Sequence, residues 1–228
     1  FQMAKTPGQT VKALTQFELG FLSPEIGLKQ GLTDPFTGMS MGQTAEELAH
    51  RFGITRWQAD DYALESHRRL AKAQEEGWLE GEVEPMFAPD GTAYDHDDGV
   101  RPDSTIEALG KLKPVFEPYG DVTAGNASQV TDGACWMILA SDEAVSRHGL
   151  TPLATIRDSE WAALDPKVMG LGPVLASSPL MTRTGLSLDD IDLWEINEAF
   201  AAQVLACLEA FADADFCREV LGLDAPVG

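Results

Sequence analysis

The sequence lacks a long apolar run and an excess of basic residues, and each absence excludes a class of protein. No apolar stretch approaches the roughly 18 residues that a membrane-spanning helix needs, so we expect no membrane span. The 16 Lys and Arg residues face 37 Asp and Glu residues, which gives a formal net charge of −21. That charge argues against nucleic acid or an anionic membrane as a partner. An anionic ligand must therefore be bound by a few local cations or by helix N-termini.

Cysteine is also scarce, with Cys135, Cys207 and Cys217 as its only positions. Their spacing contains no Cys-x-x-Cys pair, and three cysteines are too few for a disulfide scaffold. This composition fits a reducing cytosol, so we predict a cytoplasmic protein. Cys135 belongs to an apolar run that we expect to be buried, and no cysteine has the electropositive surroundings that lower a thiol pKa. We predict three inert thiols and no metal site.

The residue pattern divides the chain into three regions and predicts an α/β protein. Residues 1–114 are mainly helical and irregular. Residues 115–150 contain the apolar run 134–140, which is typical of a strand buried on both faces. Residues 151–228 alternate strands with helices, which indicates a layered α/β fold. The elements expected in these last two regions are a short helix from Ser141 to His148, strands at 153–157 and 191–196, and helices at 173–184 and 197–211.

Capping patterns place the helices of the first region. Thr55-Arg-Trp-Gln58 predicts a helix to about Glu76, with Gly77 directly after its end. Thr44-Ala-Glu-Glu47 has the same capping-box form and predicts another helix start. The remaining expectations are a helix at 7–17, an extended loop at 20–42, a polar loop at 91–102, and a short helix capped by Ser104-Thr-Ile-Glu107 that ends before Pro114.

Four groups of short motifs follow one another in a fixed order over nearly the whole chain. They are Met-Gly-Gln-Thr-Ala-Glu (41–46) with Ser66-His67; Arg101-Pro102 with Lys-Leu-Lys-Pro-Val-Phe (111–116); Val-Thr-Ala-Gly-Asn-Ala-Ser (122–128) with Thr-Asp-Gly-Ala (131–134); and Asp-Pro-Lys-Val-Met-Gly (165–170) with Gly172-Pro173 and Asn-Glu-Ala-Phe (197–200). Each motif alone is a weak signal. In this order, from about residue 31 to residue 203, they resemble the thiolase family.

The resemblance implies a layered αβαβα fold, incomplete here, with an inserted and mainly helical loop domain. It assigns residues 1–114 to the loop domain that covers coenzyme A, residues 115–150 to the end of the N-terminal α/β domain, and residues 151–228 to the start of the C-terminal one. It also implies a homodimer or homotetramer that uses coenzyme A and acyl-CoA as substrates, with no covalently bound cofactor. The reaction is thiolytic cleavage of 3-ketoacyl-CoA, or the reverse Claisen condensation.

The region from Asp95 to Arg101 and the long helix from Thr55 look more like the degradative, long-chain members of the family. These members act in fatty-acid β-oxidation and include the thiolase subunit of a trifunctional complex. The resemblance therefore also implies a multienzyme partner subunit.

The resemblance assigns Asn197 a catalytic role, in which it fixes a water that donates into an oxyanion hole. Asn is equally a preferred helix N-cap, so capping is the alternative interpretation of Asn197. Phe200 is matched to a position against the acyl or pantetheine group, although its helical spacing also fits the core.

Five further positions match coenzyme-binding residues of the family. Arg101 resembles a cation near the adenine and phosphates, with a solvated loop arginine as the alternative. Ala124 and Ser128 match small residues along the pantetheine tunnel, in a segment whose Gly-Asn pair also fits a plain turn. Met41 and Met169 match positions beside the thioester, where packing is the alternative.

The sequence departs from the family in its reactive groups. It has no early nucleophilic cysteine, no Gly-His-Pro histidine and no second cysteine in a Gly-rich motif. Because these groups are expected to flank this segment, we interpret the sequence as part of a longer protein that is inactive in this segment alone. The alternative is a non-catalytic, thiolase-like protein that binds acyl-CoA or serves as a scaffold. Four histidines lie at polar positions and are expected to be solvated: His50, His67, His96 and His148.

Overall fold

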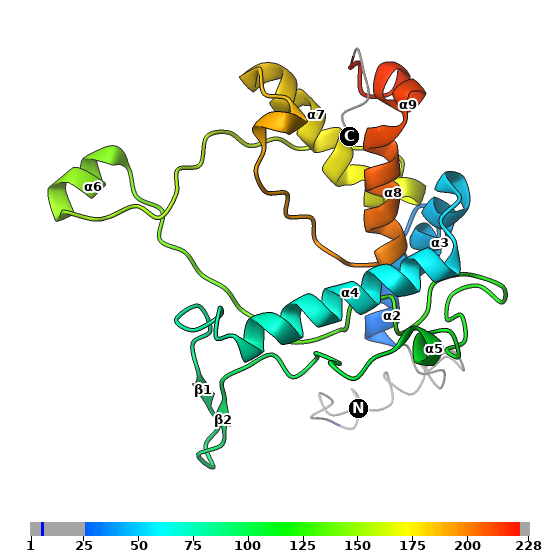
Figure 1. Cartoon of the computed structure of the whole chain (residues 1–228), viewed down its shortest axis with the longest axis horizontal. Helices are drawn as coiled ribbons and strands as arrows, with labels where there is room; N and C mark the ends of the chain where they lie inside the picture. The colour runs from blue at the N-terminus through cyan, green and yellow to red at the C-terminus, as the bar shows by residue number, and fades with distance from the viewer. Residues whose placement is uncertain (1–5, 7–25, 224–228) are drawn as a thin grey trace.

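Helices form most of the regular structure in the computed structural model, which describes Thr6 and residues 26–223 (Figure 1). The predicted helix at 7–17 lies outside the described residues. Within that described part, no helix is both long and apolar enough to cross a bilayer. In chain order the elements are α2 (Gly27–Gly31), α3 (Met41–Phe52), α4 (Arg56–Glu75), β1 (Met86–Phe87), β2 (Ala93–Tyr94), α5 (Ile106–Leu109), α6 (Asp142–His148), the 3-10 helix η2 (Pro166–Leu171), α7 (Gly172–Thr184), the 3-10 helix η3 (Leu188–Asp190), α8 (Ala201–Ala212) and α9 (Ala214–Glu219).

Local capping determines where α3 and α4 begin. The α4 capping box of Thr55 and Gln58 is formed as predicted, and Gly77 has the left-handed φ of 72° expected just after the helix. The predicted start of α3 at Thr44 is wrong. Ser40 and Gln43 form the capping box, and α3 begins at Met41, three residues before Thr44. The Thr44 hydroxyl instead donates to the carbonyl of Met41 inside the helix, over 2.7 Å.

Helix α8 lies at the centre of the core, with α3, α4, α7 and η2 packed around it (Figure 1). One buried cluster joins Leu48 of α3 to Val174 of α7 and Phe211 of α8. A second cluster joins Ala45, Ala49 and Ile54 to Val122 and Ala202. Burial of each large side chain contributes roughly 1.5–3 kcal/mol. The small residues of the second cluster let α3 and the start of α8 lie close to the segment around Val122.

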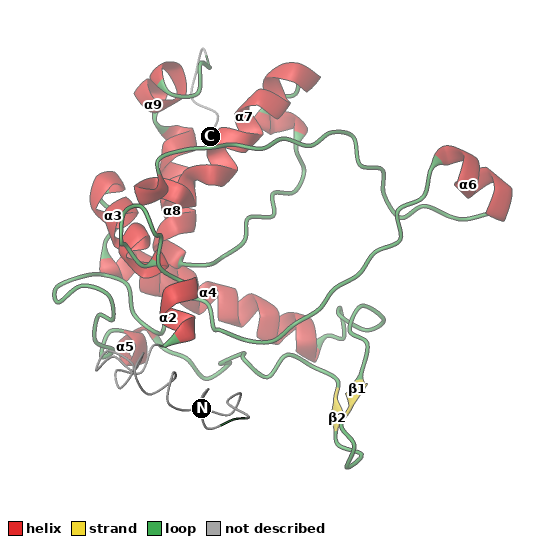
Figure 2. Ribbon diagram, turned by 180° about the vertical axis from the view of Figure 1, so that it is seen from behind, coloured by secondary structure: helices red, strands yellow, loops and turns green. Residues whose placement is uncertain are grey.

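The three strands predicted from apolar runs are not formed in the described chain. Residues 134–140, 153–157 and 191–196 run as extended backbone without a paired neighbour. Most of their side chains are therefore exposed, as Trp136 at 93% and Leu153 at 103% illustrate, whereas Trp194 at 38% packs against Phe211 of α8. A strand needs another strand to bind its N–H and C=O groups, and no described segment lies alongside these three. Figure 2 shows them as long loops, with α6 standing away from the helical body.

Sheet structure in the described residues is limited to an antiparallel hairpin and isolated bridges. In the hairpin, Met86 pairs with Tyr94 and Phe87 with Ala93, so β2 interrupts the loop predicted at 91–102. Helix α2 likewise lies within the loop predicted at 20–42. The predicted helices α6 and α7 are confirmed, with α6 capped by Ser141. The α5 cap is Thr105 rather than Ser104, and α5 ends before Pro114 as predicted.

Candidate functional site

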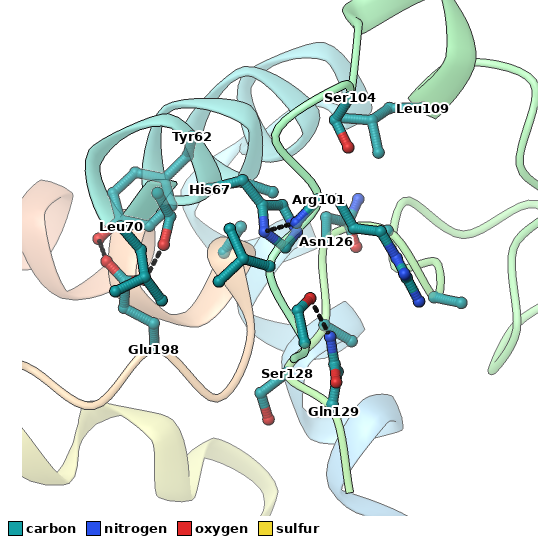
Figure 3. A pocket seen from close by; sticks show the side chains of 18 of the residues that line it. Tyr62, His67, Leu70, Arg101, Ser104, Leu109, Asn126, Ser128, Gln129 and Glu198 are labelled. Carbon is teal, nitrogen blue, oxygen red and sulfur yellow. Dashed lines mark hydrogen bonds between the residues drawn. The ribbon is translucent and has the colours of Figure 1, made fainter. Parts of the chain in front are cut away.

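A cleft of about 650 Å³ lies between α4 and the turn at 122–128 (Figure 3). Helix α4 forms one wall, the loop at 97–101 and the segment around α5 continue it, and residues of the turn form the opposite side. Glu198 and Ala201 complete the lining. The volume falls within the roughly 300–1,000 Å³ typical of small-molecule sites.

A buried polar pair joins α4 to the turn, and Asn126 of this pair also lines the cleft. The Asn126 amide donates to the Asp60 carboxylate over 2.9 Å, and the two residues are only 3% and 2% exposed. Arg56 donates its Nε to the other Asp60 oxygen over 2.7 Å and its Nη2 to the carbonyl of Leu109 over 2.6 Å. A buried carboxylate is tolerated when its charge and lone pairs are satisfied in this way. The pair fixes α4 against the turn.

The turn itself is held from two further sides. Glu46 of α3 accepts hydrogen bonds from the backbone N–H groups of Asp121 and Val122, over 2.8 and 3.0 Å. The Asn126 side-chain oxygen accepts from the Thr123 N–H over 2.8 Å, which closes the turn on itself. The backbone of this side of the cleft is therefore fixed by hydrogen bonds to Glu46 and within the turn itself.

The turn is also hydrogen-bonded to the chain just before α8. The Ser128 N–H donates to the carbonyl of Ala199 over 2.9 Å, and the Ala201 N–H donates to the carbonyl of Asn126 over 3.0 Å. These bonds accompany an isolated antiparallel bridge between Ala127 and Phe200. They place residues 199–201 in extended contact with the turn, so α8 begins at Ala201 and not at residue 197 as predicted.

His67 and Arg101 meet on the α4 side of the cleft (Figure 3). The Arg101 backbone N–H donates to Nδ1 of His67 over 3.3 Å, and His67 is half-buried, so its predicted solvation is wrong. The Arg101 guanidinium forms no ion pair with any other described residue. It is thus a cation at the cleft whose charge is available to an anionic group.

Glu198 stands at the end of the cleft and accepts two hydrogen bonds from α4 (Figure 3). The Tyr62 hydroxyl donates to Oε1 over 2.7 Å, and the Ser66 hydroxyl donates to Oε2 over 2.5 Å. Partial burial, followed by the bond to Glu198, raises the pKa of Tyr62 above its usual value, so the hydroxyl stays protonated and remains a donor.

The structure brings together three of the seven residues predicted for the site. Arg101, Ala124 and Ser128 all line the cleft, and the small side chains of Ala124 and Ser128 are exposed towards it. Neither residue contributes to the buried core, so their size is not required for packing.

The other four predicted residues lie outside the cleft lining. Asn197 is exposed and forms no hydrogen bond within the described chain, while its neighbour Glu198 does line the cleft. Because Phe200 is the N-cap residue of α8, the capping interpretation of Asn197 is wrong. Phe200 packs edge-on against Phe116, with ring centroids 6.0 Å apart. Met41 and Met169 are partly exposed on α3 and η2, two elements that pack against each other.

No cysteine lines the cleft in the described part of the chain, which contains all three. Cys207 and Cys217 are buried, and burial raises the pKa of the Cys207 thiol to about 11. The prediction that Cys207 is inert is thereby supported by its surroundings. Cys135 is exposed, so its predicted burial is wrong, because its apolar run has no neighbouring strand. Among the described residues no group of acidic, His and Cys side chains could bind a metal ion.

Sequence reasoning missed the polar residues that build the cleft, chiefly Asp60, Tyr62 and Glu198. Asp60 offered a signal, because helical spacing places it on one face with Leu64, beside Ala59 and Ala63. A carboxylate on an apolar helix face requires a buried partner. The contact between Tyr62 and Glu198 spans 136 residues of sequence and left no local signal.

Comparison with known proteins identifies relatives for the whole chain. The family model for the thiolase N-terminal domain matches residues 7–143, and that for the thiolase C-terminal domain matches residues 150–217. The mitochondrial trifunctional enzyme subunit beta of Mus musculus is 39% identical over 227 residues, which cover 99% of this chain and 47% of the mouse protein. A 3-ketoacyl-CoA thiolase of Marinobacter nauticus is 46% identical over 174 residues, or 74% of this chain and 44% of that protein.

A solved structure shares the fold. The crystal structure of human mitochondrial 3-ketoacyl-CoA thiolase in complex with CoA matches with a TM-score of 0.79 and 42% identity, covering 91% of this chain and 50% of that one. The predicted α/β fold class is therefore confirmed, although the three strands are unpaired here. The chain spans about half the length of these relatives.

The predicted cytoplasmic location is wrong. Several relatives that align with 99% of this chain are named as mitochondrial subunits, from mouse, cattle and rat. Scarce cysteine indicates a reducing compartment and does not distinguish one such compartment from another.

Proposed function

Because the chain belongs to the thiolase family, we propose that the whole protein is an acyl-CoA C-acyltransferase that acts in fatty-acid β-oxidation. It cleaves 3-ketoacyl-CoA with a second coenzyme A, or catalyses the reverse Claisen condensation. The observation that carries the proposal is the cleft, where Arg101, Ala124 and Ser128 lie together as the resemblance implies for coenzyme A binding.

The chemistry of coenzyme A fits this cleft. Its pantetheine arm is narrow and uncharged, so it needs small side chains and a fixed backbone along its path. Ala124 and Ser128 supply the small side chains, and the hydrogen bonds that Asp60 and Glu46 accept fix the turn. Its phosphates need a cation, which the unpaired guanidinium of Arg101 supplies without a general basic surface.

We propose that Asn197 is the catalytic residue that this chain contributes to the active site. In the proposed reaction, a cysteine thiolate attacks the 3-keto carbon, the bond between C2 and C3 breaks, and acetyl-CoA leaves as an enolate that takes up a proton. The thiol of a second coenzyme A then attacks the acyl-cysteine thioester and releases the cysteine. Negative charge develops on the thioester oxygen, and a water fixed by the Asn197 amide donates to that oxygen. Phe200, Met41 and Met169 are proposed to border the acyl and thioester groups, and each is partly exposed.

The larger organisation follows the family. We propose that residues 1–114 form the coenzyme-covering domain, that residues 115–150 end the N-terminal α/β domain, and that residues 151–228 begin the C-terminal one. We propose a homodimer or homotetramer. The relative named as a subunit of a trifunctional enzyme supports a multienzyme partner.

A thiolysis assay on the complete protein tests this function. The assay measures loss of 3-ketoacyl-CoA and formation of acetyl-CoA and the shortened acyl-CoA. Asn197→Ala is expected to reduce turnover by about 100-fold while leaving acyl-CoA binding nearly unchanged. Asp192→Ala, in the same extended segment, is the control and should keep full turnover. Undiminished turnover in Asn197→Ala would contradict the assignment.

One observation favours a second function, which applies if the protein has no reactive cysteine or histidine beyond those in this chain. No cysteine faces the cleft in the described residues, so coenzyme A bound there meets no nucleophile. Such a protein binds acyl-CoA without turning it over. An intact mass of 24.6 kDa together with coenzyme A binding and no thiolysis would identify this second function. A greater mass with thiolysis would identify the first.

A further inference from the structure

The segment that carries Asn197 is held by backbone hydrogen bonds on one side only, and on its other side the nearest contact is the Trp194 ring, which packs against Phe211 with ring centroids 5.6 Å apart. From residue 199 onward it is hydrogen-bonded to the turn through Ser128 and Asn126. From residue 191 to residue 197 the described structure contains no backbone hydrogen bond to this segment. Asn197 therefore lies between the Trp194 ring contact and the bridged residues, and the hydrogen bonds to the side chain of Glu198 are the contact nearest to it.

That attachment is the pair of hydrogen bonds from α4 to Glu198. Tyr62 and Ser66 are four residues apart, so both hydroxyls project from one face of the helix. Each binds a different oxygen of the carboxylate, over 2.7 and 2.5 Å. A single bond would let the carboxylate rotate, whereas two bonds to its two oxygens fix its orientation.

The helix that supplies these donors is itself fixed to the cleft. Two residues before Tyr62, Asp60 of α4 accepts a hydrogen bond from Asn126 of the turn, and Arg56 donates to the carbonyl of Leu109 at the end of α5. Tyr62 also packs against Ala59, Ala63 and Ala201, which holds its ring at the start of α8. Glu198 is therefore held in place by α4, the same helix that is bonded to the turn and to α5 around the cleft.

We propose that Tyr62 and Ser66 are positioning residues, which fix the place of the Asn197 amide relative to the cleft through their two hydrogen bonds to Glu198. This inference rests on the proposed function of Asn197. Loss of the bonds lets the chain between Trp194 and residue 199 shift and moves Asn197 away from its working position. Small displacements of this kind reduce turnover strongly, because the reacting groups must stay aligned.

The test uses Tyr62→Phe and Ser66→Ala in the complete protein, because each variant removes a hydroxyl and keeps most of the packing. We expect kcat to fall roughly tenfold in each variant, with the KM for coenzyme A nearly unchanged because neither hydroxyl is needed for the cleft's shape. Tyr94→Phe on the exposed hairpin and Ser146→Ala on α6 are the matched controls and should keep wild-type kcat. Unchanged kcat in both test variants would overturn the proposal.

A second measurement separates positioning from plain stabilisation. Hydrogen–deuterium exchange at the amides of Ser128 and Ala201, whose hydrogen bonds fix the chain directly after Glu198, should accelerate in Tyr62→Phe, while the melting temperature stays close to that of the wild type. Glu198→Ala removes both acceptors and should exchange at least as fast, and the double variant Tyr62→Phe/Glu198→Ala should be no faster than Glu198→Ala, because the Tyr62 hydroxyl then has no partner left to lose. Additive effects, a raised KM or a general loss of stability would each overturn the proposal.

Failure of the proposed function gives a different result. A wild-type protein without thiolysis rejects that function, whereas the exchange measurement needs no turnover and still tests whether Tyr62 and Ser66 hold the Asn197 segment. Normal thiolysis with unchanged exchange in the variants rejects the positioning role alone.

Discussion

The side-chain amide of Asn126 donates to the buried carboxylate of Asp60 over 2.9 Å, and this bond joins α4 to the turn across 66 residues of sequence. The same amide also donates to the carbonyl of Asp121 over 2.9 Å. Both amide hydrogens and the side-chain oxygen of Asn126 are therefore used, which leaves a neutral residue fully satisfied in the interior. The shape of the candidate site depends on this contact because it joins α4 to the turn at 122–128, which form opposite sides of the cleft.

Asp60→Ala is expected to destabilise the fold by roughly 3 kcal/mol, because it leaves the Arg56 guanidinium and the Asn126 amide without their shared partner. For a chain of this size the melting temperature should fall by on the order of 10 °C. Asp61→Ala is the matched control, since Asp61 is exposed and makes none of these contacts. Equal melting temperatures for the two variants would show that the buried pair contributes no stability.

Gly42→Ala tests the packing between α3 and the Phe116 ring. A Cβ at residue 42 would overlap the Phe116 ring, which packs against Phe200 at the start of α8. We expect a loss of about 1–3 kcal/mol from overpacking. Gly31→Ala at the end of α2 has open space around its Cβ and should change the free energy of unfolding little. Chemical denaturation of both variants measures the difference.

Glu46→Ala removes the acceptor for the N–H groups of Asp121 and Val122. Val122 is fully buried, so its N–H would lose its partner in the interior, and we expect a cost of roughly 1–3 kcal/mol. Glu47→Ala breaks only a surface ion pair with Arg51 and should cost less than about 1 kcal/mol. Thermal unfolding compares them, and a larger loss in Glu47→Ala would contradict the role of Glu46.

The three thiols should react at very different rates. At pH 8 we expect a disulfide reagent to label exposed Cys135 at once, and to reach buried Cys207 and Cys217 only after unfolding. Cys135→Ser should abolish the fast phase. Rapid labelling of all three thiols in the folded protein would contradict the burial of Cys207 and Cys217.

Burial of Cys207 also makes stability depend on pH. Its folded pKa of about 11 lies above the ordinary value of 9.0, so between these values the unfolded thiol loses its proton first. The contribution of Cys207 to stability is therefore full below pH 9 and is lost as the pH rises towards 11. Cys207→Ala should reduce the loss of stability measured over this interval, and an identical pH profile in that variant would contradict this account.

The sequence predicted those elements whose causes are local. Helix α4 follows from the Thr55 and Gln58 capping box and from the glycine after its end, all of which lie within the helix or next to it. The start of α8 was placed too early because a long-range bridge between Ala127 and Phe200 holds the preceding residues extended. The strand at 134–140 was wrongly predicted because an apolar run forms a strand only beside a partner strand.

Only part of the candidate site was predicted, because only some of its residues belong to local sequence motifs. Arg101, Ala124 and Ser128 belong to motifs that are contiguous in sequence, and the structure places all three at one cleft. The contact of Tyr62 with Glu198 depends on how α4 packs against the start of α8, and short-range residue patterns do not carry that information.

The most direct test of the central claim is the affinity of the complete protein for coenzyme A, measured by titration calorimetry. Ala124→Leu and Ser128→Leu each add bulk to the cleft without entering the core, and we expect each to weaken binding at least tenfold, or about 1.4 kcal/mol. Ser146→Leu on the distant helix α6 is the control and should bind like the wild type. Wild-type affinity in both cleft variants would contradict the claim that this cleft binds coenzyme A.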